Sequence, residues 1–297
     1  MFSDLVSDLD HYSVEPDLLL NVPYVPTDEK VVDEMLSLAD VGRRDVLYDL
    51  GSGDGRIVVA AAMQRDARAV GIELDPLRVA DAMEYAGSAG VEYMVDFVED
   101  DIFSADISEA TVVTLYLLDS INVELRPRLL SELAPGTRIV SHAFNMGDWQ
   151  ADERRTFSGA IVYLWIVPAR VAGTWEWPTP DGGRYRVTLE QKYQHVTASA
   201  WRNGRKARVK TAKLSGSRLT LLLRASENAL LEQYILEFAN GRLVCATADE
   251  ETRARAKTAP AERSGALNDT GLAAARPSRL SDTGRERLGS RRQPSGG

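Results

Sequence analysis

The sequence predicts an α/β protein: a mostly parallel sheet with helices on both faces, followed by a C-terminal antiparallel β-meander and a disordered tail. Two observations carry this prediction. Between residues 45 and 143, short apolar runs typical of buried strands alternate with segments of helical period. After residue 160, strand patterns are separated by turn signals such as Asn203-Gly204 and Asn240-Gly241, at intervals of about twelve residues.

Residues 1–45 are predicted to form a lead-in with one cap helix. Apolar side chains recur at helical spacing in Asp28–Ala39, and Thr27 is the predicted N-cap. Val22–Pro26 contains two prolines, and each disfavours the α conformation in the residue before it. The chain is therefore expected to be extended before its first helix.

The α/β domain is predicted to span residues 46–178. Its first five strands are expected at 46–50, 69–74, 95–98, 111–117 and 138–143. The helices between them are expected at 56–65, 76–88 and 122–133. Asp75 and Pro76 are the predicted N-cap and first residue of the second of these helices. Strands separated by helices of this length form right-handed βαβ units, so the strands should run parallel in one sheet.

The β-meander is predicted to cover residues 179–245, where Tyr185, Val187 and Leu189 alternate with polar residues. Residues 246–297 show no hydrophobic period and few large apolar side chains. Such a segment buries too little apolar surface to offset the entropy lost on ordering. We therefore expect residues 246–297 to be a disordered tail.

The net charge argues against a partner held mainly through phosphates. The 297 residues carry 35 Lys and Arg against 44 Asp and Glu, a net charge of −9. Residues 246–297 contribute +3, and residues 1–245 contribute −12 from 25 basic and 37 acidic side chains. Nucleic-acid affinity comes largely from Lys and Arg that neutralise the backbone. We therefore expect no nucleic-acid partner, although these counts do not exclude a local basic patch.

The cysteine and histidine content and the hydrophobic pattern exclude further kinds of site and of protein. The single cysteine, Cys245, excludes an internal disulfide and a Cys-rich zinc site. The three histidines lie far apart in the sequence, and no metal site is predicted. The longest wholly apolar run, Ala160–Val167, is far shorter than a membrane span, and the acidic N-terminus is unlike a secretory signal. We expect a cytoplasmic protein without a membrane segment.

A glycine-rich loop follows the first predicted strand and opens the next helix. Its glycines let the backbone turn sharply and approach a ligand closely. A dinucleotide is one candidate ligand, but the third glycine comes one residue early for that fingerprint, and Asp54 would lie close to the pyrophosphate. S-adenosylmethionine carries positive sulfonium and ammonium groups, so an acidic loop suits it better. The cofactor-binding residues predicted in this loop are Asp49, Gly51, Ser52, Gly53 and Gly55.

Acidic residues also follow the second and third predicted strands. Glu73 lies twenty residues after Gly53, where a carboxylate can accept hydrogen bonds from both ribose hydroxyls. NAD enzymes use the same arrangement, so Glu73 indicates an adenosine-type ligand without separating the two cofactors. A helix-capping role is the alternative, but Asp75 already supplies that cap. After the third strand, Asp101 is predicted to bind the adenine, with Asp100 as the neighbouring alternative.

These residues resemble the pattern of a known family. Asp49–Gly55 with Glu73 and Asp101 is similar to the class I, Rossmann-like S-adenosylmethionine-dependent methyltransferases. Pro23–Pro26 and Ser141–Trp149 resemble a narrower group, the bacterial relatives of the ATP synthase c-subunit and adenine nucleotide translocase lysine methyltransferases. The resemblance implies N-methylation of a lysine in a protein substrate, with S-adenosyl-L-methionine as the cofactor.

The resemblance covers about residues 22–177 and implies further contacts with the cofactor. Tyr24 and Thr27 are expected to fold over it, and Leu74 and Ile102 are expected to complete its site. Methyl transfer from an activated sulfonium depends mainly on positioning the reacting atoms. We therefore expect neither a nucleophilic residue nor a metal ion.

Catalytic candidates come from the segments after the fourth and fifth predicted strands, because ligands of such sheets bind at the carboxyl ends of the strands. Tyr116 and Asp148 are the predicted catalytic residues. His142 and Trp149 also belong to the segment after the fifth strand. Each aromatic residue has a structural role as its alternative: Tyr116 as a core residue, His142 as a residue at the end of a strand, and Trp149 as a residue that fills the space beside the meander.

Three functions remain open from the sequence. The first is protein lysine N-methylation, which the acidic body and the narrower resemblance favour. The second is methylation of a small molecule, with the meander closing over the acceptor. The third is a non-catalytic scaffold that binds S-adenosylmethionine and recruits partners through the meander. Transfer of label from the donor to an acceptor separates the first two from the third.

Overall fold

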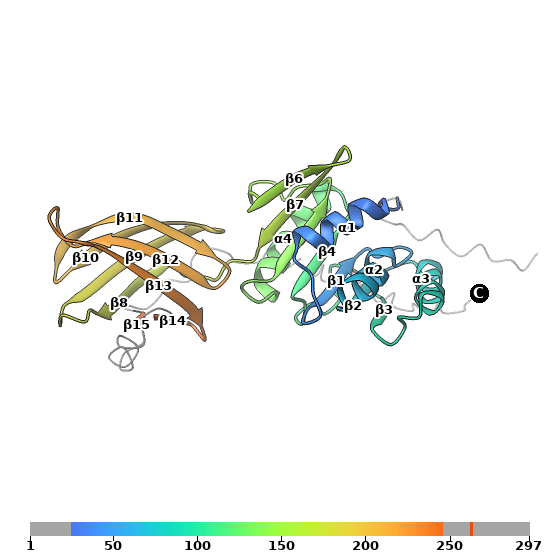
Figure 1. Ribbon diagram of the computed structural model, residues 1–297, viewed down its shortest axis with the longest axis horizontal. Coiled ribbons are helices and arrows are strands. Elements are labelled where there is room, and N and C mark those ends of the chain that lie inside the picture. Colours follow the sequence, from blue (N-terminus) through green and yellow to red (C-terminus); the bar gives the residue numbers. More distant parts are fainter. Residues whose placement is uncertain (1–24, 246–261, 264–297) are drawn as a thin grey trace, which may run out of the picture. The chain divides into compact units, whose positions relative to one another are not determined.

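The computed structural model describes residues 25–245 and 262–263 (Figure 1). These residues form a seven-stranded sheet with helices and an eight-stranded antiparallel sheet. The predicted α/β class, with its mostly parallel sheet followed by an antiparallel meander, is confirmed.

The seven-stranded sheet has the order β3-β2-β1-β4-β5-β7-β6. Strands β1 to β5 run parallel, whereas β7 is antiparallel to both β5 and β6. The helices and strands in chain order are α1 (Glu29–Leu38), β1 (Val46–Leu50), α2 (Arg56–Arg65), β2 (Arg68–Glu73), α3 (Pro76–Ala89), β3 (Val95–Glu99), β4 (Val112–Leu115), α4 (Asp119–Glu132), β5 (Arg138–His142), β6 (Glu153–Phe157) and β7 (Ala160–Ile166).

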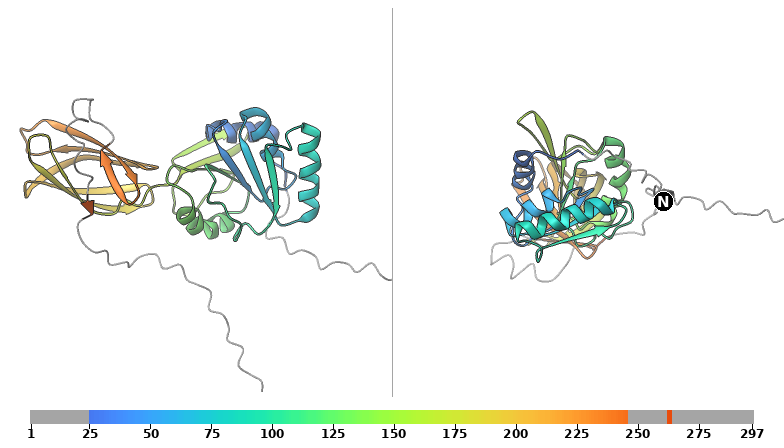
Figure 2. Two further views of the ribbon diagram at one scale, coloured as in Figure 1. Left: turned by 90° about the horizontal axis from the view of Figure 1, so that it is seen from below. Right: turned by 90° about the vertical axis from the view of Figure 1, so that its right-hand side faces the viewer.

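Helices cover both faces of this sheet (Figure 2). Side chains of α1, α2 and α3 pack in one apolar cluster with Leu47 of β1, and side chains of α4 pack in a second cluster with Tyr48. Successive residues of a strand point to opposite faces, so adjacent residues of β1 enter different clusters. The two clusters bury the apolar faces of all four helices.

Capping residues explain where the helices begin. Asp28 is the N-cap of α1, and its carboxylate accepts a hydrogen bond from the Lys30 N–H. The prediction of Thr27 as this cap is therefore wrong by one residue; the Asp28 carboxylate reaches the free amides of the first turn. The prediction of Asp75 and Pro76 at the start of α3 is confirmed, since the Asp75 carboxylate accepts from the Leu77 N–H.

The glycine that precedes α2 is held in a conformation that other residues adopt only with strain. Gly55 has φ +77°, and a Cβ at this position would lie 2.7 Å from the Phe97 ring and 2.8 Å from Ala82. Gly55 was predicted to contact the cofactor, but it is not among the residues that line the cavity described below. Gly55 instead lets α2 begin close to β3 and α3, which is a packing role.

We expect Gly55→Ala to destabilise the fold by about 2 kcal/mol or more, because it combines a positive φ with two steric clashes. Chemical denaturation monitored by circular dichroism measures this change. Gly90→Ala is the matched control, since Gly90 has φ +71° but open space around its Cβ position. It should cost about 1 kcal/mol. Equal destabilisation in the two variants would contradict the packing role.

Two features of the first sheet were not expected from the sequence. Strand β6 has no apolar alternation and is exposed along its whole length, so no strand pattern marks it. It forms as a hairpin partner of β7, through backbone hydrogen bonds that are independent of side-chain type. Helix α4 begins at Asp119, earlier than expected, and accommodates Pro127 in its interior.

The eight-stranded sheet has the order β14-β13-β12-β11-β10-β9-β8-β15, with antiparallel neighbours throughout. Its strands are β8 (Gly173–Pro178), β9 (Arg184–Lys192), β10 (His195–Arg202), β11 (Arg205–Ser215), β12 (Arg218–Arg224), β13 (Leu231–Ala239), β14 (Arg242–Cys245) and β15 (Glu262–Arg263). Buried side chains from alternate positions of these strands form a third apolar cluster.

The sheet assignment moves the boundary between the two domains. The α/β domain was expected to end at residue 178, but β8 pairs with β9 and belongs to the second sheet. The boundary therefore lies between β7 and β8, at residues 167–172. Two residues of the expected disordered tail, Glu262 and Arg263, pair with β8, because an edge strand presents unpaired backbone groups. The rest of 246–297 lies outside the described residues.

None of the helices in the described ranges has both the length and the apolar content that crossing a bilayer requires.

Candidate active site

A cavity of about 170 Å³ lies where four parallel strands end. Strand β1 pairs with β2 on one side and with β4 on the other, so the chain changes direction along the sheet at this point. Ligands of open α/β sheets bind in the crevice at such a position. The lining residues follow the ends of β1, β2, β3 and β4 or belong to the segment 25–27.

The glycine loop after β1 forms the floor of this cavity. Gly51 and Gly53 both have positive φ, +80° and +54°. A Cβ on Gly51 would lie 3.1 Å from the Leu117 side chain, and the backbone N–H groups of Gly51 and Ser52 both donate to the Ile72 carbonyl. The loop is therefore tied to the end of β2 and brings its backbone close to the cavity.

Glu73 is fixed at the end of β2 by three backbone amides. Its Oε2 accepts a hydrogen bond from the Gly53 N–H at 2.8 Å, and its Oε1 accepts from Leu74 and Asp75 at 2.9 and 3.1 Å. The carboxylate therefore joins the glycine loop to the start of α3. Asp75 caps that helix with its own side chain, so Glu73 is not the N-cap residue, and its contact with the ribose stays a prediction.

Asp49 is a buried carboxyl beneath the cavity. Its side chain accepts a hydrogen bond from the Thr114 hydroxyl at 2.7 Å, and the residue is only 2% exposed. Burial raises the pKa of Asp49 to about 7; the Thr114 hydrogen bond opposes this shift, and the charges of Glu73 and Asp54 add to it. The site therefore contains a carboxyl that changes charge near neutral pH.

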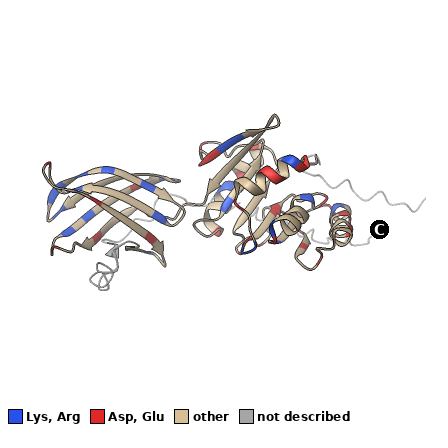
Figure 3. Cartoon of the chain, viewed as in Figure 1, with Lys and Arg blue, Asp and Glu red and all other residues tan. Residues whose placement is uncertain are grey.

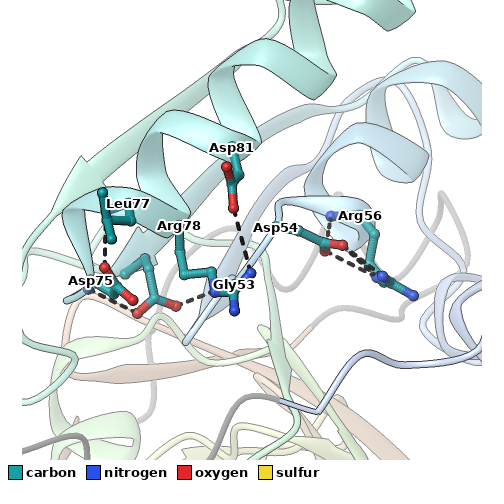
Figure 4. Close-up of polar contacts among 8 residues, drawn as sticks. Gly53, Asp54, Arg56, Asp75, Leu77, Arg78 and Asp81 are labelled. Atoms are coloured by element: carbon teal, nitrogen blue, oxygen red, sulfur yellow. Dashed lines mark hydrogen bonds and ion pairs between the residues drawn. The ribbon is translucent and has the colours of Figure 1, made fainter.

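Two arginines at the cavity were not predicted as site residues. Arg56, at the start of α2, donates to both carboxylate oxygens of Asp54 (Figure 4). It also donates to the Thr27 carbonyl at 2.8 Å. Arg78 lines the cavity from α3 and contacts Asp81 at 3.4 Å (Figure 4). The position of Arg56 directly after the glycine loop could have indicated it as a site residue. The helix that follows the loop begins at the carboxyl edge of the sheet, where ligands bind.

The charges around the cavity favour a cation. Among the described residues, the lining contains five acidic side chains and two arginines. The acidic residues are Asp49, Asp54, Glu73, Asp75 and Asp101. Acidic groups that converge in a cleft raise the local concentration of a positively charged ligand.

Asp101 and Ile102 complete the cavity beyond β3. The Asp101 carboxylate accepts from the Phe103 N–H at 2.9 Å, and its own N–H donates to the Asp100 carboxylate at 2.7 Å. The turn thus orients Asp101 with local hydrogen bonds. Asp100, the neighbouring alternative, is absent from the lining.

An aromatic stack stands at the β4 side of the cavity. Tyr116, which lines the cavity, lies over His142 with ring centroids 4.0 Å apart, and Phe144 is 6.1 Å from Tyr116. The Thr27 hydroxyl is 3.4 Å from His142 Nδ1. Burial lowers the pKa of His142 below its usual value, so this imidazole is neutral at physiological pH.

Asp148, predicted as a catalytic residue, is not among the residues that line the cavity. It forms ion pairs with Arg126 at 2.6 Å and Lys192 at 3.0 Å, and it accepts a hydrogen bond from the Tyr193 hydroxyl. These contacts lower the pKa of Asp148 to about 2, mainly through the Lys192 and Tyr193 hydrogen bonds. These partners hold Asp148 outside the cavity lining, and its catalytic role stays a prediction. Tyr24, which was predicted to contact the cofactor, lies outside the described residues.

Trp149 packs in the core beside the second sheet. Its side chain is 1% exposed, its indole N–H donates to Gln194, and its ring stacks on Tyr193. The structure therefore supports a packing role for Trp149 beside the meander rather than a role in lining a pocket.

Comparison with known proteins identifies the family. A family model described as the ANTKMT methyltransferase domain matches residues 49–153. A protein-lysine N-methyltransferase of Saccharolobus islandicus is 47% identical over 134 residues, which are 45% of this chain and 83% of that protein. The chain belongs to this methyltransferase family. The match spans the glycine loop and the strand ends that form the cavity, so the expected resemblance is confirmed.

Other relatives of this methyltransferase carry different names. The adenine nucleotide translocase lysine N-methyltransferase of Mus musculus is 38% identical over 45% of this chain, and the match covers 58% of that protein. A solved structure, described as an RNA methyltransferase from Salinibacter ruber in complex with S-adenosyl-L-homocysteine, is 56% identical. That match covers 50% of this chain and 96% of the other, with a TM-score of 0.49. The family model ends before β7, so the eight-stranded sheet lies outside it.

The methyltransferase uses S-adenosyl-L-methionine, and the residues at the cavity fit this cofactor. Ser52 Oγ is buried and has no hydrogen-bond partner among the described residues, so the glycine loop contains a polar atom that a ligand can satisfy. The acidic excess suits a ligand with sulfonium and ammonium charges. We propose that Glu73 binds the ribose and that Asp101 and Ile102 bind the adenine. The glycine loop and Asp49 would then face the cationic end.

Proposed function

We propose that this methyltransferase transfers a methyl group from S-adenosylmethionine to the side-chain amine of a lysine in a protein. The aromatic stack of Tyr116, His142 and Phe144 beside an acidic cavity is the observation that carries this proposal. Aromatic faces attract an ammonium group, and acidic groups strengthen that attraction. The relative from Saccharolobus islandicus named as a protein-lysine N-methyltransferase supports the same acceptor.

The residues of the chain act by positioning. The bound cofactor supplies a methyl group on a positively charged sulfur, which is already activated for transfer. Glu73 and the glycine loop orient the donor, and Tyr116 borders the side from which an acceptor would approach. Holding the reacting atoms in line supplies about 7–11 kcal/mol of the barrier reduction in well-oriented systems.

A lysine acceptor must lose one proton before its nitrogen can attack. His142 is a candidate to hold that proton, because burial keeps its imidazole neutral and its ring stacks on Tyr116. A neutral imidazole accepts a proton through one ring nitrogen. The Thr27 hydroxyl beside Nδ1 would orient the ring.

The test is transfer of labelled methyl groups to fractionated cell extract. We expect purified protein and labelled S-adenosylmethionine to label one or a few polypeptides, and we expect mass spectrometry to locate the methyl group on a lysine. Glu73→Ala serves as the inactive control, because it removes the proposed ribose contact. Phe144→Ala should retain donor binding but reduce transfer, since Phe144 is absent from the cavity lining.

Each other outcome identifies a different function. Label confined to small metabolites would show a small-molecule methyltransferase, and label confined to RNA would show an RNA acceptor. Donor binding without transfer to any fraction would show a scaffold. Any of these three results would contradict protein lysine methylation.

A further inference from the structure

The two domains have opposite charge. Residues 1–172 carry 13 Lys and Arg against 31 Asp and Glu, whereas residues 173–245 carry 12 against six. The expectation of no nucleic-acid partner rested on the summed charge of residues 1–245, and that sum conceals a basic β-domain.

Lys and Arg occur along several strands of this β-domain (Figure 3). Along β11, Ala207 and Leu214 are buried in the apolar cluster, whereas Lys206, Arg208 and Lys213 are exposed. Residues two apart in a strand project from the same face about 7 Å apart. Lys210, also exposed, lies at the irregularity between Val209 and Thr211.

A tryptophan lies among these cations. Trp201 of β10 is directly opposite Lys206 on one side and Arg186 on the other, and it is half-buried. A shallow groove runs over the same face, lined by Thr174, Glu176, Arg184, Arg186, Thr188, Trp201, Asn203 and Gly204. The face thus combines a flat aromatic ring with flanking positive charges.

Several of these cations have no acidic partner within the described part of the chain. Arg184 and Arg186 both pair with Glu176, but Lys206, Arg208 and Lys210 form no ion pair there. The charge of Lys213 acts on the Asp152 carboxyl. Arg208 lies directly opposite Arg224 in the register, an arrangement of like charges that is destabilising without an anion. The Arg224 Nε atom is buried and has no hydrogen-bond partner among the described residues.

We propose that the outward face of β9 to β12, the basic face, binds a single-stranded nucleic acid. Phosphates would neutralise the unpaired cations of β11 and relieve the repulsion between Arg208 and Arg224. Trp201 would stack on a base, as aromatic residues do on the sheet faces of single-strand-binding proteins. An acidic polypeptide would match the charge but would have no flat base for the tryptophan, so nucleic acid is favoured.

The test is fluorescence anisotropy of the full chain with a labelled oligouridine of about 20 nucleotides. We expect three phosphate contacts from β11, by Lys206, Arg208 and Lys210, so affinity should fall about 20-fold between about 50 and 200 mM salt. Lys206→Glu combined with Arg208→Glu should reduce affinity at least tenfold and reduce the salt dependence by about two thirds. Trp201→Ala should reduce affinity about fivefold, because it removes stacking.

Arg43→Glu combined with Arg44→Glu is the matched control, since both residues are exposed in the acidic domain. It should leave oligouridine binding within about twofold of wild type. Thermal melting and S-adenosylmethionine binding verify that each variant is folded. Absence of binding at low salt, an equal loss in the control, or displacement by polyglutamate as effective as by unlabelled RNA would overturn the proposal. Polyglutamate displacement would instead indicate an acidic polypeptide.

Discussion

Replacing Glu73 by alanine is expected to weaken S-adenosylmethionine binding about 100-fold or more. The proposed ribose contact consists of two hydrogen bonds to a charged acceptor, and each such bond contributes about 1.5–3 kcal/mol. The substitution also removes the acceptor that holds the Gly53 N–H, so the glycine loop loses its tie to the end of β2. Isothermal titration calorimetry with the donor measures the change.

Glu99→Ala is the matched control for this prediction. Glu99 ends β3 directly beside Glu73 in the register, but it is exposed and absent from the cavity lining. We expect its donor affinity to stay within about twofold of wild type, as for a surface change without a specific contact. Comparable affinity in the Glu73 and Glu99 variants would contradict the proposed cofactor site.

The second large effect concerns Asp49, where stability and cofactor binding should change in opposite directions. Burial raises the pKa of this carboxyl from 3.8 to about 7, so the folded state holds the proton more tightly than the unfolded state. Stability is therefore lost as the pH rises from about 4 to 7. Asp49→Asn removes the titrating charge and should stabilise the free protein at pH 8 by on the order of 2–4 kcal/mol.

The same substitution should weaken binding of the positively charged donor. In the wild type, donor affinity should rise by up to about tenfold per pH unit between pH 5.5 and 7, because the donor favours the ionised carboxylate. In Asp49→Asn this rise should be absent. Thermal melts and calorimetry across this pH range measure both properties. A variant that is less stable than wild type at pH 8, or one that retains the pH-dependent affinity, would contradict this account.

The acids of the cofactor cavity were predictable because their signals are local in the sequence. Asp49 and Glu73 lie at the carboxyl ends of β1 and β2, and Asp101 comes shortly after β3; each of these strands is recognisable from a short apolar run. Parallel strands joined by helices align their carboxyl ends at one edge of the sheet. Local pattern and a general rule of topology were therefore sufficient to bring these three residues to one cavity.

Asp148 shows where that reasoning fails. It follows the fifth strand of the parallel series, as a site residue would, and the sequence contains no sign of its partners. Arg126 lies on α4, and Lys192 and Tyr193 lie more than forty residues away in the chain. Contacts over such separations depend on how whole elements pack, so only the structure could show that Asp148 does not line the cavity.

The sequence by itself determined the α/β class, the strand and helix positions around the glycine loop, and the acidic edge that suits S-adenosylmethionine. Periodicity, glycines and caps act over a few residues, which is why a linear sequence reveals them. The tertiary structure decided that β8 joins the second sheet, that Asp49 titrates near neutral pH and that basic residues form one face of the β-domain. Strand partners, burial and charge neighbours all arise from residues distant in the chain, and only folding brings them together.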